Sequence, residues 1–266
     1  MIALIETKRL QLNYGEKVII DSLDLIIPKG EITVLIGANG CGKSTLLRSI
    51  ARLLKPNSGS ILLNNENITR FTTKETAKHL AILPQQPMAP EGLTVLQLVK
   101  QGRFPYQNWR KQWSTEDQQV VEQAIAATGL TEFKDYEIDN LSGGQRQRAW
   151  IAMTLAQQTD LILLDEPTTY LDVTHQIEVL DLLYKLNQEE NRTIVMVLHD
   201  INLACRYATN IIALVNKELY AQGRPEDIIT VKLVKDVFQL NCKIIEDPIY
   251  GTPMCIPYGN KNEPRQ

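Results

Sequence analysis

The sequence has few cysteines, and their spacing excludes the common cysteine-based sites. Cys41, Cys205, Cys242 and Cys255 form no Cys-x-x-Cys pair and no zinc-finger spacing. A disulfide-stapled secreted fold is therefore not expected, and neither is a cysteine-bound zinc site. We expect reduced thiols in the cytoplasm, with Cys41 acting as a small residue of the glycine-rich segment that contains it.

Long apolar runs and an excess of positive charge are also missing. No apolar stretch approaches the length that would span a bilayer. Glu6, Lys8 and Arg9 interrupt the N-terminus too early for a secretory signal. The formal net charge is −3, which argues against a general nucleic-acid binder. We therefore expect a globular protein of one large domain, or of one domain with a small lobe.

The most informative segment is rich in glycine and stands between an apolar run and a helix-forming run. It comprises Gly37, Ala38, Asn39, Gly40, Cys41, Gly42, Lys43, Ser44 and Thr45. Glycines let backbone N–H groups turn around an anion, and a helix N-terminus adds its positive dipole end. Strand, glycine loop and helix in this order predict a phosphate-binding P-loop. In such a loop Lys43 contacts the terminal phosphates and Ser44 binds Mg²⁺.

Strand-like and helix-like runs alternate along most of the chain, which predicts an α/β fold. Strands are expected at residues 3–12, 18–27, 32–36, 60–63, 79–84, 161–166, 193–198, 211–215 and 218–221. Helices are expected at residues 46–51, 73–78, 146–157, 173–188, 201–206, 225–229 and 231–238. The first two strands are joined tightly, so they are expected to form an antiparallel pair beside the P-loop strand.

A helical lobe is predicted in the middle of the chain. The β signals stop between residues 86 and 141, where helices are expected at 95–101 and 116–128. Ser114 or Thr115 is a suitable N-cap for the second helix. We interpret residues 86–140 as a lobe inserted into a core made of residues 1–85 and 141–240, followed by a short extension at 241–266.

A second anion site is predicted after the lobe. Ser142, Gly143, Gly144 and Gln145 precede a helix, so the same backbone and dipole argument applies to them. A plain N-cap role for Ser142 is the alternative. Further along, residues 161–164 are apolar and end in Asp165 and Glu166.

The two carboxylates at the end of this apolar run are candidates for chemistry. Ligands bind at the carboxyl ends of buried parallel strands. Asp165 is a candidate ligand for Mg²⁺, and Glu166 can orient or deprotonate a water molecule. Two other residues have simpler interpretations: Asp172 can cap the helix that follows it, and His199, at a strand end, is more often structural than catalytic.

In this order, the motifs resemble those of the ATP-binding-cassette (ABC) ATPases over nearly the whole chain. The resemblance implies a cassette with a mixed core sheet, an N-terminal antiparallel β subdomain and an inserted helical lobe. It implies that Tyr14 stacks on adenine and that Gln85, with Gln86 as the alternative, contacts Mg²⁺ or the attacking water. Glu166 then resembles the catalytic carboxylate and His199 the switch histidine near the γ-phosphate.

The resemblance also implies a second copy of the chain. In this family two cassettes pair head to tail with ATP between them. The P-loop at 37–45 of one copy then faces the family's signature pentapeptide, which Leu141 to Gln145 match, of the other copy. Asp172 resembles the loop aspartate that reaches across the dimer. Two phosphate half-sites in one chain are explained by this arrangement.

Within the family, the chain is similar to importers of ferric siderophores, haem and cobalamin, on residues 102–106 and on the tail around Asp247. This implies a peripheral subunit on the cytoplasmic face of the membrane that hydrolyses ATP with Mg²⁺. Its partners are then an integral membrane permease and, indirectly, a substrate-binding protein, with no nucleic acid. Another ABC transporter ATPase, exporters included, and a cytosolic ABC ATPase without transport are the alternatives.

A permease-docking surface is expected on the lobe. Arg103 and Tyr106 follow the first lobe helix on a loop that also holds Phe104 and Trp109. Aromatic and arginine side chains are typical interface anchors. We expect Arg103 and Tyr106 to face the permease or to support the surface that does. Val95 and Leu98 are assigned instead to the lobe's own core.

Overall fold

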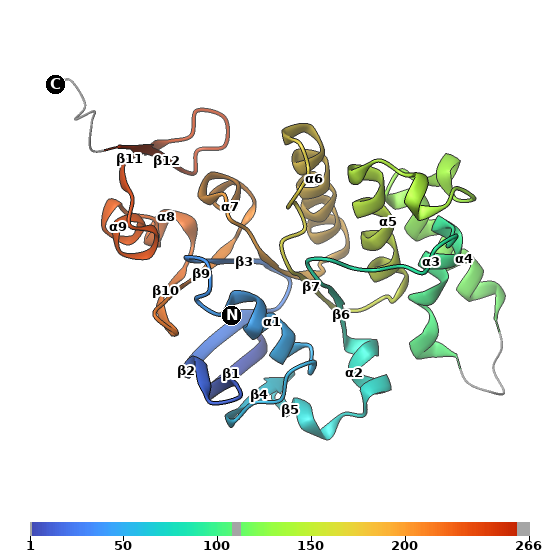
Figure 1. The fold of residues 1–266 in the computed structure, drawn as a ribbon, viewed down its shortest axis with the longest axis horizontal. Coiled ribbons are helices and arrows are strands. Elements are labelled where there is room, and N and C mark those ends of the chain that lie inside the picture. The colour runs from blue at the N-terminus through green and yellow to red at the C-terminus, as the bar shows by residue number, and fades with distance from the viewer. Residues whose placement is uncertain (1, 108–112, 260–266) are drawn as a thin grey trace. The chain divides into compact units, whose positions relative to one another are not determined.

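The computed structural model describes residues 2–107 and 113–259, so Trp109 and the last seven residues of the predicted extension lie outside the described residues. The chain falls into two compact units (Figure 1). Unit 1 comprises Met1–Ile68 and Val195–Gln266, and unit 2 comprises Thr69–Ile194. In the described parts, no helix is both long and apolar enough to cross a bilayer.

Unit 1 contains two sheets, a C-terminal hairpin and four α-helices among the described residues. Its elements are β1 (Ala3–Tyr14), β2 (Lys17–Pro28), β3 (Ile32–Ile36), α1 (Lys43–Ile50), β4 (Ser58–Leu63), β5 (Glu66–Asn67), α7 (Ile201–Tyr207), β9 (Asn210–Val215), β10 (Glu218–Gly223), α8 (Pro225–Ile228), α9 (Val231–Phe238), β11 (Asn241–Glu246) and β12 (Pro253–Tyr258). The antiparallel sheet has the order β2-β1-β4-β5.

The P-loop strand lies in the second, mixed sheet of unit 1. β3 pairs in parallel with β9, and β9 pairs antiparallel with β10 across the turn at Asn216-Lys217. All five residues of β3 are buried, since strands covered on both faces are apolar throughout. The C-terminal hairpin of β11 and β12 covers Val234 of α9 with Cys242 and Cys255.

Unit 2 contains the helices of the predicted lobe and the two carboxylate residues. Its elements are α2 (Thr73–His79), β6 (Leu80–Leu83), α3 (Val95–Gln101), α4 (Thr115–Ala127), α5 (Gly143–Ala156), β7 (Leu161–Leu164) and α6 (Val173–Glu190), with 3₁₀ turns at Phe104–Tyr106, Thr131–Phe133 and Ile138–Asn140. The 3₁₀ turn Ile68–Arg70 and strand β8 (Thr193–Val197) cross the boundaries between the units.

Local signals set several of these boundaries. Ser114 is the N-cap of α4, as predicted, and forms a reciprocal capping box with Asp117. α5 begins at Gly143, three residues earlier than expected, because Ser142 and Gln145 form the same kind of box. Val95 and Leu98 are fully buried between the lobe helices, which confirms their assignment to the lobe core.

Candidate functional site

The P-loop in unit 1 requires glycine at its first position. Gly37 follows β3 directly and has a φ of 150°. A Cβ there would lie 2.5 Å from the carbonyl oxygen of Leu214 and 2.7 Å from Cys41 Sγ. Gly40 and Gly42 also have positive φ angles, of 80° and 106°, a region that favours glycine. The surroundings therefore require glycine at Gly37, and the backbone conformation favours it at Gly40 and Gly42.

Lys43 is the first residue of α1, and its side chain folds back onto the loop. Its ammonium group donates hydrogen bonds to the carbonyl oxygens of Gly37, at 2.8 Å, and Ala38, at 3.1 Å, and the residue is only 5% exposed. Ser44 and Thr45 follow in the first turn of the same helix. One helix end therefore presents a cation, hydroxyl groups and backbone N–H groups, a donor set that suits phosphate.

His199 lies at the sheet edge from which the P-loop begins. The backbone N–H of Leu198, directly after β8, donates to the carbonyl oxygen of Leu35 in β3 at 3.4 Å. The carboxyl ends of the two strands therefore lie side by side, and exposed His199 comes next in the chain. In the same unit, Asn39 is exposed in the P-loop, and Tyr14 is the last residue of β1 with 45% of its surface exposed.

The structure brings Gln85 and Glu166 together in unit 2. β6 and β7 are parallel and in register, and the N–H of Asp165 donates to Leu83 at 2.9 Å. Beyond these strand ends, the Gln85 side-chain amide donates to Glu166 Oε2 at 2.5 Å. The hydroxyl of Thr169 donates to the same oxygen at 2.9 Å. Asp165 itself is buried, with 6% of its surface exposed.

The hydrogen bonds at Glu166 distinguish Gln85 from Gln86 and identify Thr169 as a further partner. Of the neighbouring glutamines, it is Gln85 whose amide contacts the candidate catalytic acid. Thr169 is a partner that the sequence did not single out, and its only signal is a position three residues after Glu166. Glu166 has a φ of 54°, in the left-handed region where a non-glycine residue is uncommon.

The signature residues form the N-terminal turn of α5. Ser142 Oγ accepts a hydrogen bond from the N–H of Gln145 at 3.3 Å, and the Gln145 side chain accepts one from the N–H of Ser142 at 3.0 Å. Ser142 is therefore the N-cap of α5, and the signature turn lies at the positive dipole end of this 14-residue helix. Ser142 and Gly143 are exposed there, whereas Gly144 is buried.

Asp172 is the N-cap of α6, as the sequence suggested. Its Oδ1 accepts a hydrogen bond from the backbone N–H of His175 at 2.9 Å and lies 2.7 Å from His175 Nδ1. These hydrogen bonds, the backbone one first and the ring second, lower the pKa of Asp172 below its usual value. Exposed Asp172 is therefore a carboxylate at neutral pH.

Comparison with known proteins now identifies the family. A family model described as ABC transporter matches residues 20–169, more than half of the chain. The chain belongs to the ABC transporter family. It is 67% identical over 262 residues to the petrobactin import ATP-binding protein FpuD of Bacillus anthracis, a match that covers 98% of this chain and 96% of that protein. It is 57% identical over 257 residues to the achromobactin transport ATP-binding protein CbrD of Dickeya dadantii, covering 97% and 96%.

A solved ABC cassette shares the fold. The ATP-binding cassette MJ0796, described as a dimer in a post-hydrolysis state bound to ADP and Pi, matches with a TM-score of 0.72 at 31% identity, covering 83% of this chain and 98% of that one. The predicted ABC cassette fold is therefore confirmed. The chain is an ATP-binding subunit of this family and an ATPase.

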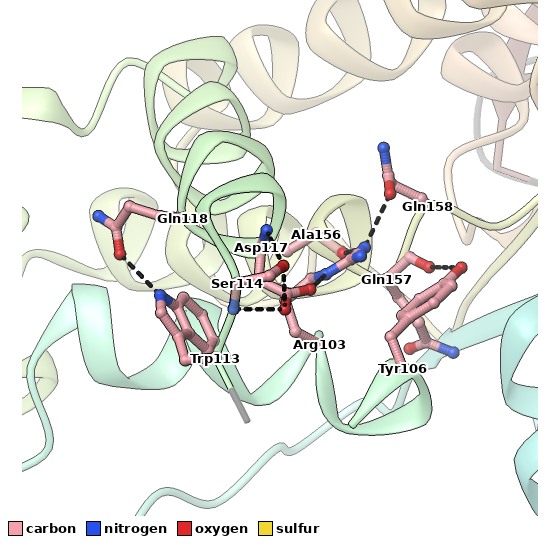
Figure 2. Close-up of polar contacts among 9 residues, drawn as sticks. All are labelled: Arg103, Tyr106, Trp113, Ser114, Asp117, Gln118, Ala156, Gln157 and Gln158. Carbon is pink, nitrogen blue, oxygen red and sulfur yellow. Dashed lines mark hydrogen bonds and ion pairs between the residues drawn. The ribbon is translucent and has the colours of Figure 1, made fainter. Parts of the chain in front are cut away.

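Arg103 does not face outward towards a permease, so the first of its two expected positions is wrong, and support of the docking surface stays a prediction. Arg103 is 2% exposed, and its Nε donates to Asp117 Oδ1 at 2.8 Å (Figure 2). Its Nη1 donates to the carbonyl oxygen of Ala156 at 3.0 Å and to the Gln158 side chain at 2.8 Å. The guanidinium group therefore binds the C-terminal end of α5 inside the lobe, where it faces no partner.

The loop around Arg103 lies close to α5 because a glycine precedes it. A Cβ at Gly102 would lie 2.3 Å from the carbonyl oxygen of Met153. Tyr106 is half-buried, and its hydroxyl donates to the carbonyl oxygen of Gln157 at 2.9 Å. The Arg103 guanidinium carbon lies 4.0 Å from the centroid of the Tyr106 ring. Arg103 and Tyr106 therefore attach the loop to the end of α5, whereas Phe104, between them in the sequence, is 64% exposed.

Proposed function

We propose that this ABC ATPase powers an importer of iron–siderophore complexes. The observation that carries the proposal is its identity of 67% with the petrobactin import ATP-binding protein FpuD over nearly the full length of both chains. The achromobactin transport ATP-binding protein CbrD supports the same class of cargo. The cargo does not touch this subunit in the proposed mechanism, which is why the cargo class rests on relatives and not on a pocket.

Nucleotide binding is assigned to the P-loop and to Tyr14. In this assignment the backbone N–H groups of residues 37–45 surround the phosphates, and the Lys43 ammonium moves from its carbonyl partners to the terminal phosphates. Exchanging neutral carbonyl acceptors for phosphate oxygens strengthens its hydrogen bonds. The exposed ring of Tyr14 stacks on adenine, since an aromatic face suits a flat base.

The chain offers oxygen donors that fit Mg²⁺, which prefers carboxylate, hydroxyl and carbonyl oxygens. Asp165 supplies a buried carboxylate, Ser44 a hydroxyl in the first turn of α1, and Gln85 a side-chain amide. We assign these three residues to the metal. Bound Mg²⁺ neutralises charge on the β- and γ-phosphates.

Water activation is assigned to Glu166. Its carboxylate is held by Gln85 and Thr169, which fix its orientation at the end of β7. An oriented carboxylate accepts a proton from a water molecule as that water attacks the γ-phosphate. His199, at the same sheet edge as the P-loop, is assigned to a hydrogen bond with the γ-phosphate.

The active unit is proposed to be a head-to-tail dimer. The exposed turn at Ser142 and Gly143 suits the γ-phosphate of ATP held by a second copy, together with Gln145 and the buried Gly144. Asp172 is assigned to contacts across the same dimer. Each chain then supplies one P-loop and one signature turn, to two different sites.

A membrane permease is the proposed second partner, and the helical lobe at residues 86–140 is its proposed contact. Met88 is 92% exposed and Phe104 is 64% exposed, and such apolar side chains are suited to docking. The subunit would then act at the cytoplasmic face of the membrane, with a substrate-binding protein engaged through the permease.

Uptake of radiolabelled ferric siderophore by cells tests the proposal. Cells that lack the chain should lose energy-dependent uptake and recover it with the parent chain, but not with Glu166→Gln. Labelled haem and cobalamin, tested in the same cells, measure the alternative cargoes. Unchanged siderophore uptake without the chain, together with a loss of haem or cobalamin uptake, would reassign the cargo.

A further inference from the structure

The second glycine of the signature turn is in contact with a histidine that has no assigned role. A Cβ at Gly144 would lie 2.1 Å from His175 Cδ2, 2.7 Å from Cγ and 3.0 Å from Nε2. These distances are shorter than real carbon contacts, so the imidazole occupies the space of the missing side chain. At Gly143, by contrast, a Cβ would meet only Leu171 Cδ2 at 3.7 Å, an ordinary contact.

Backbone conformation does not explain the glycine at 144. Gly144 lies inside helix α5 and is absent from the residues with positive φ among those described. Alanine is a better helix former than glycine by about 1 kcal/mol, so the helix alone would favour alanine at this position. The close approach of the His175 ring is therefore the steric reason for glycine at this position.

Asp172 fixes the orientation of this ring. The carboxylate can only accept, so His175 Nδ1 carries the proton and donates to Asp172 Oδ1 at 2.7 Å. The same oxygen accepts from the His175 backbone N–H at 2.9 Å. His175 is therefore hydrogen-bonded to Asp172 through both its backbone and its ring, and the ring packs against Gly144.

A second contact holds the same two helices one turn further on. Arg148 of α5 lies 3.7 Å from Glu178 of α6, between side chains that are 24% and 46% exposed. The first turns of α5 and α6 are thus held by the His175 ring near their beginnings and by an ion pair behind it. The signature turn and Asp172 belong to these two first turns.

We propose that His175 is a positioning residue that couples Asp172 to the signature turn. A displacement of the Asp172 loop moves the ring, and the ring moves the backbone of Gly144, so the two elements reach their ATP-bound positions together. The inference rests on the proposed roles of these elements at the shared ATP site. The His175 side chain is 33% exposed, so its contribution to overall stability is expected to be small.

Five variants of the full-length chain test the steric part of the proposal. Gly144→Ala and His175→Ala should each lower kcat for ATP hydrolysis by about tenfold, because small misplacements near the chemistry cost this much or more. The double variant should be as active as His175→Ala alone, since removing the ring makes room for the new methyl group. Gly143→Ala, alone and combined with His175→Ala, is the matched control, and the effects of these two substitutions should multiply.

Two further measurements separate positioning from folding. His175→Ala should keep the parent KM for ATP and a thermal midpoint within about 2 °C of the parent. His175→Asn can still donate to Asp172, and it should recover several-fold of the lost kcat. Parent kcat in His175→Ala, or multiplying effects in the Gly144→Ala double variant, would overturn the proposal.

None of these assays needs a permease or a siderophore. If cells without the chain keep their siderophore uptake while the Gly144 and His175 variants remain coupled, the proposed import role fails and this inference stands. If uptake depends on the chain while the effects of the two variants multiply, the import role stands and this inference fails.

Discussion

The side-chain amide of Gln85 is hydrogen-bonded to the carboxylate of Glu166. Gln85 stands where β6 ends and the chain enters the helical lobe, and Glu166 stands where the neighbouring β7 ends. A shift in the entry to the lobe therefore reaches the proposed catalytic acid through a single hydrogen bond. This link gives a physical route by which a lobe that touches a permease would alter hydrolysis.

Glu166→Gln is expected to keep ATP binding and to lose turnover by about 10²–10³-fold, because a positioned general base contributes on this scale. The variant should accumulate as an ATP-bound dimer. Steady-state phosphate release, nucleotide binding and size-exclusion chromatography measure the three properties. Glu189→Gln, an exposed carboxylate on α6, is the control and should hydrolyse ATP at the parent rate. Parent-like turnover in Glu166→Gln would contradict the assignment.

A shared active site predicts complementation between two inactive variants. Lys43→Ala removes the phosphate cation of one half-site, and Ser142→Arg blocks the other. Each alone should be inactive, but a mixture with excess Lys43→Ala should regain part of the ATPase activity, since each mixed dimer contains one intact site. Activity is measured against the molar ratio of the two chains. A fully active parent monomer at high dilution would rule out sharing.

Arg103→Met is expected to destabilise the chain, by about 3–5 kcal/mol, because it leaves the Asp117 carboxylate buried without its partner. The double variant Arg103→Met/Asp117→Asn should lose less. Urea unfolding measures the free energies, with Lys185→Met, which is 67% exposed, as the control. An equal, small loss in Arg103→Met and the control would show that the buried pair contributes nothing.

Acid should remove the contribution of the same pair. Burial raises the pKa of Asp117, but hydrogen bonds from Arg103 and Ser114 outweigh it and hold the pKa below the usual 3.8. A carboxyl group whose pKa is lower in the folded than in the unfolded state stabilises the fold. This stabilisation is complete above the unfolded-state pKa and is lost as the pH falls through the folded-state pKa. The stability difference between the parent and Asp117→Asn should therefore be constant above about pH 5 and shrink as the pH falls from about 5 towards about 2. A constant difference over this range would contradict the pKa shift.

Local chemistry made part of this structure predictable from the sequence. Asp172 is a helix cap as expected, because a cap contacts only the next turn of its own chain. The strands expected at 211–215 and 218–221 form a hairpin whose turn includes Asn216, a residue type that tolerates the left-handed conformation found there. The glycine loop before α1 also follows from local rules.

Long-range contacts were not predictable. Arg103 was considered a permease anchor because arginine and aromatic side chains are typical of interfaces, but its buried partners lie on α4 and at the end of α5, far from it in the sequence. His175 gave no signal, because a single histidine in a polar helix turn has no pattern. The choice between Gln85 and Gln86 depends on the neighbouring strand, which comes about eighty residues later in the chain.

The division of the chain into units has a consequence for its synthesis. Unit 2 is a continuous segment inserted between the two parts of unit 1. One partner of the P-loop strand β3 is β9, and the hydrogen bond from Ile32 of β3 to Thr209, just before β9, joins residues 177 positions apart. On the ribosome, Lys43 emerges long before β9, whereas the inserted unit can fold as soon as it is made. A growing chain, or one truncated before β9, therefore lacks a neighbouring strand for its nucleotide loop, and we expect such a chain not to hold ATP.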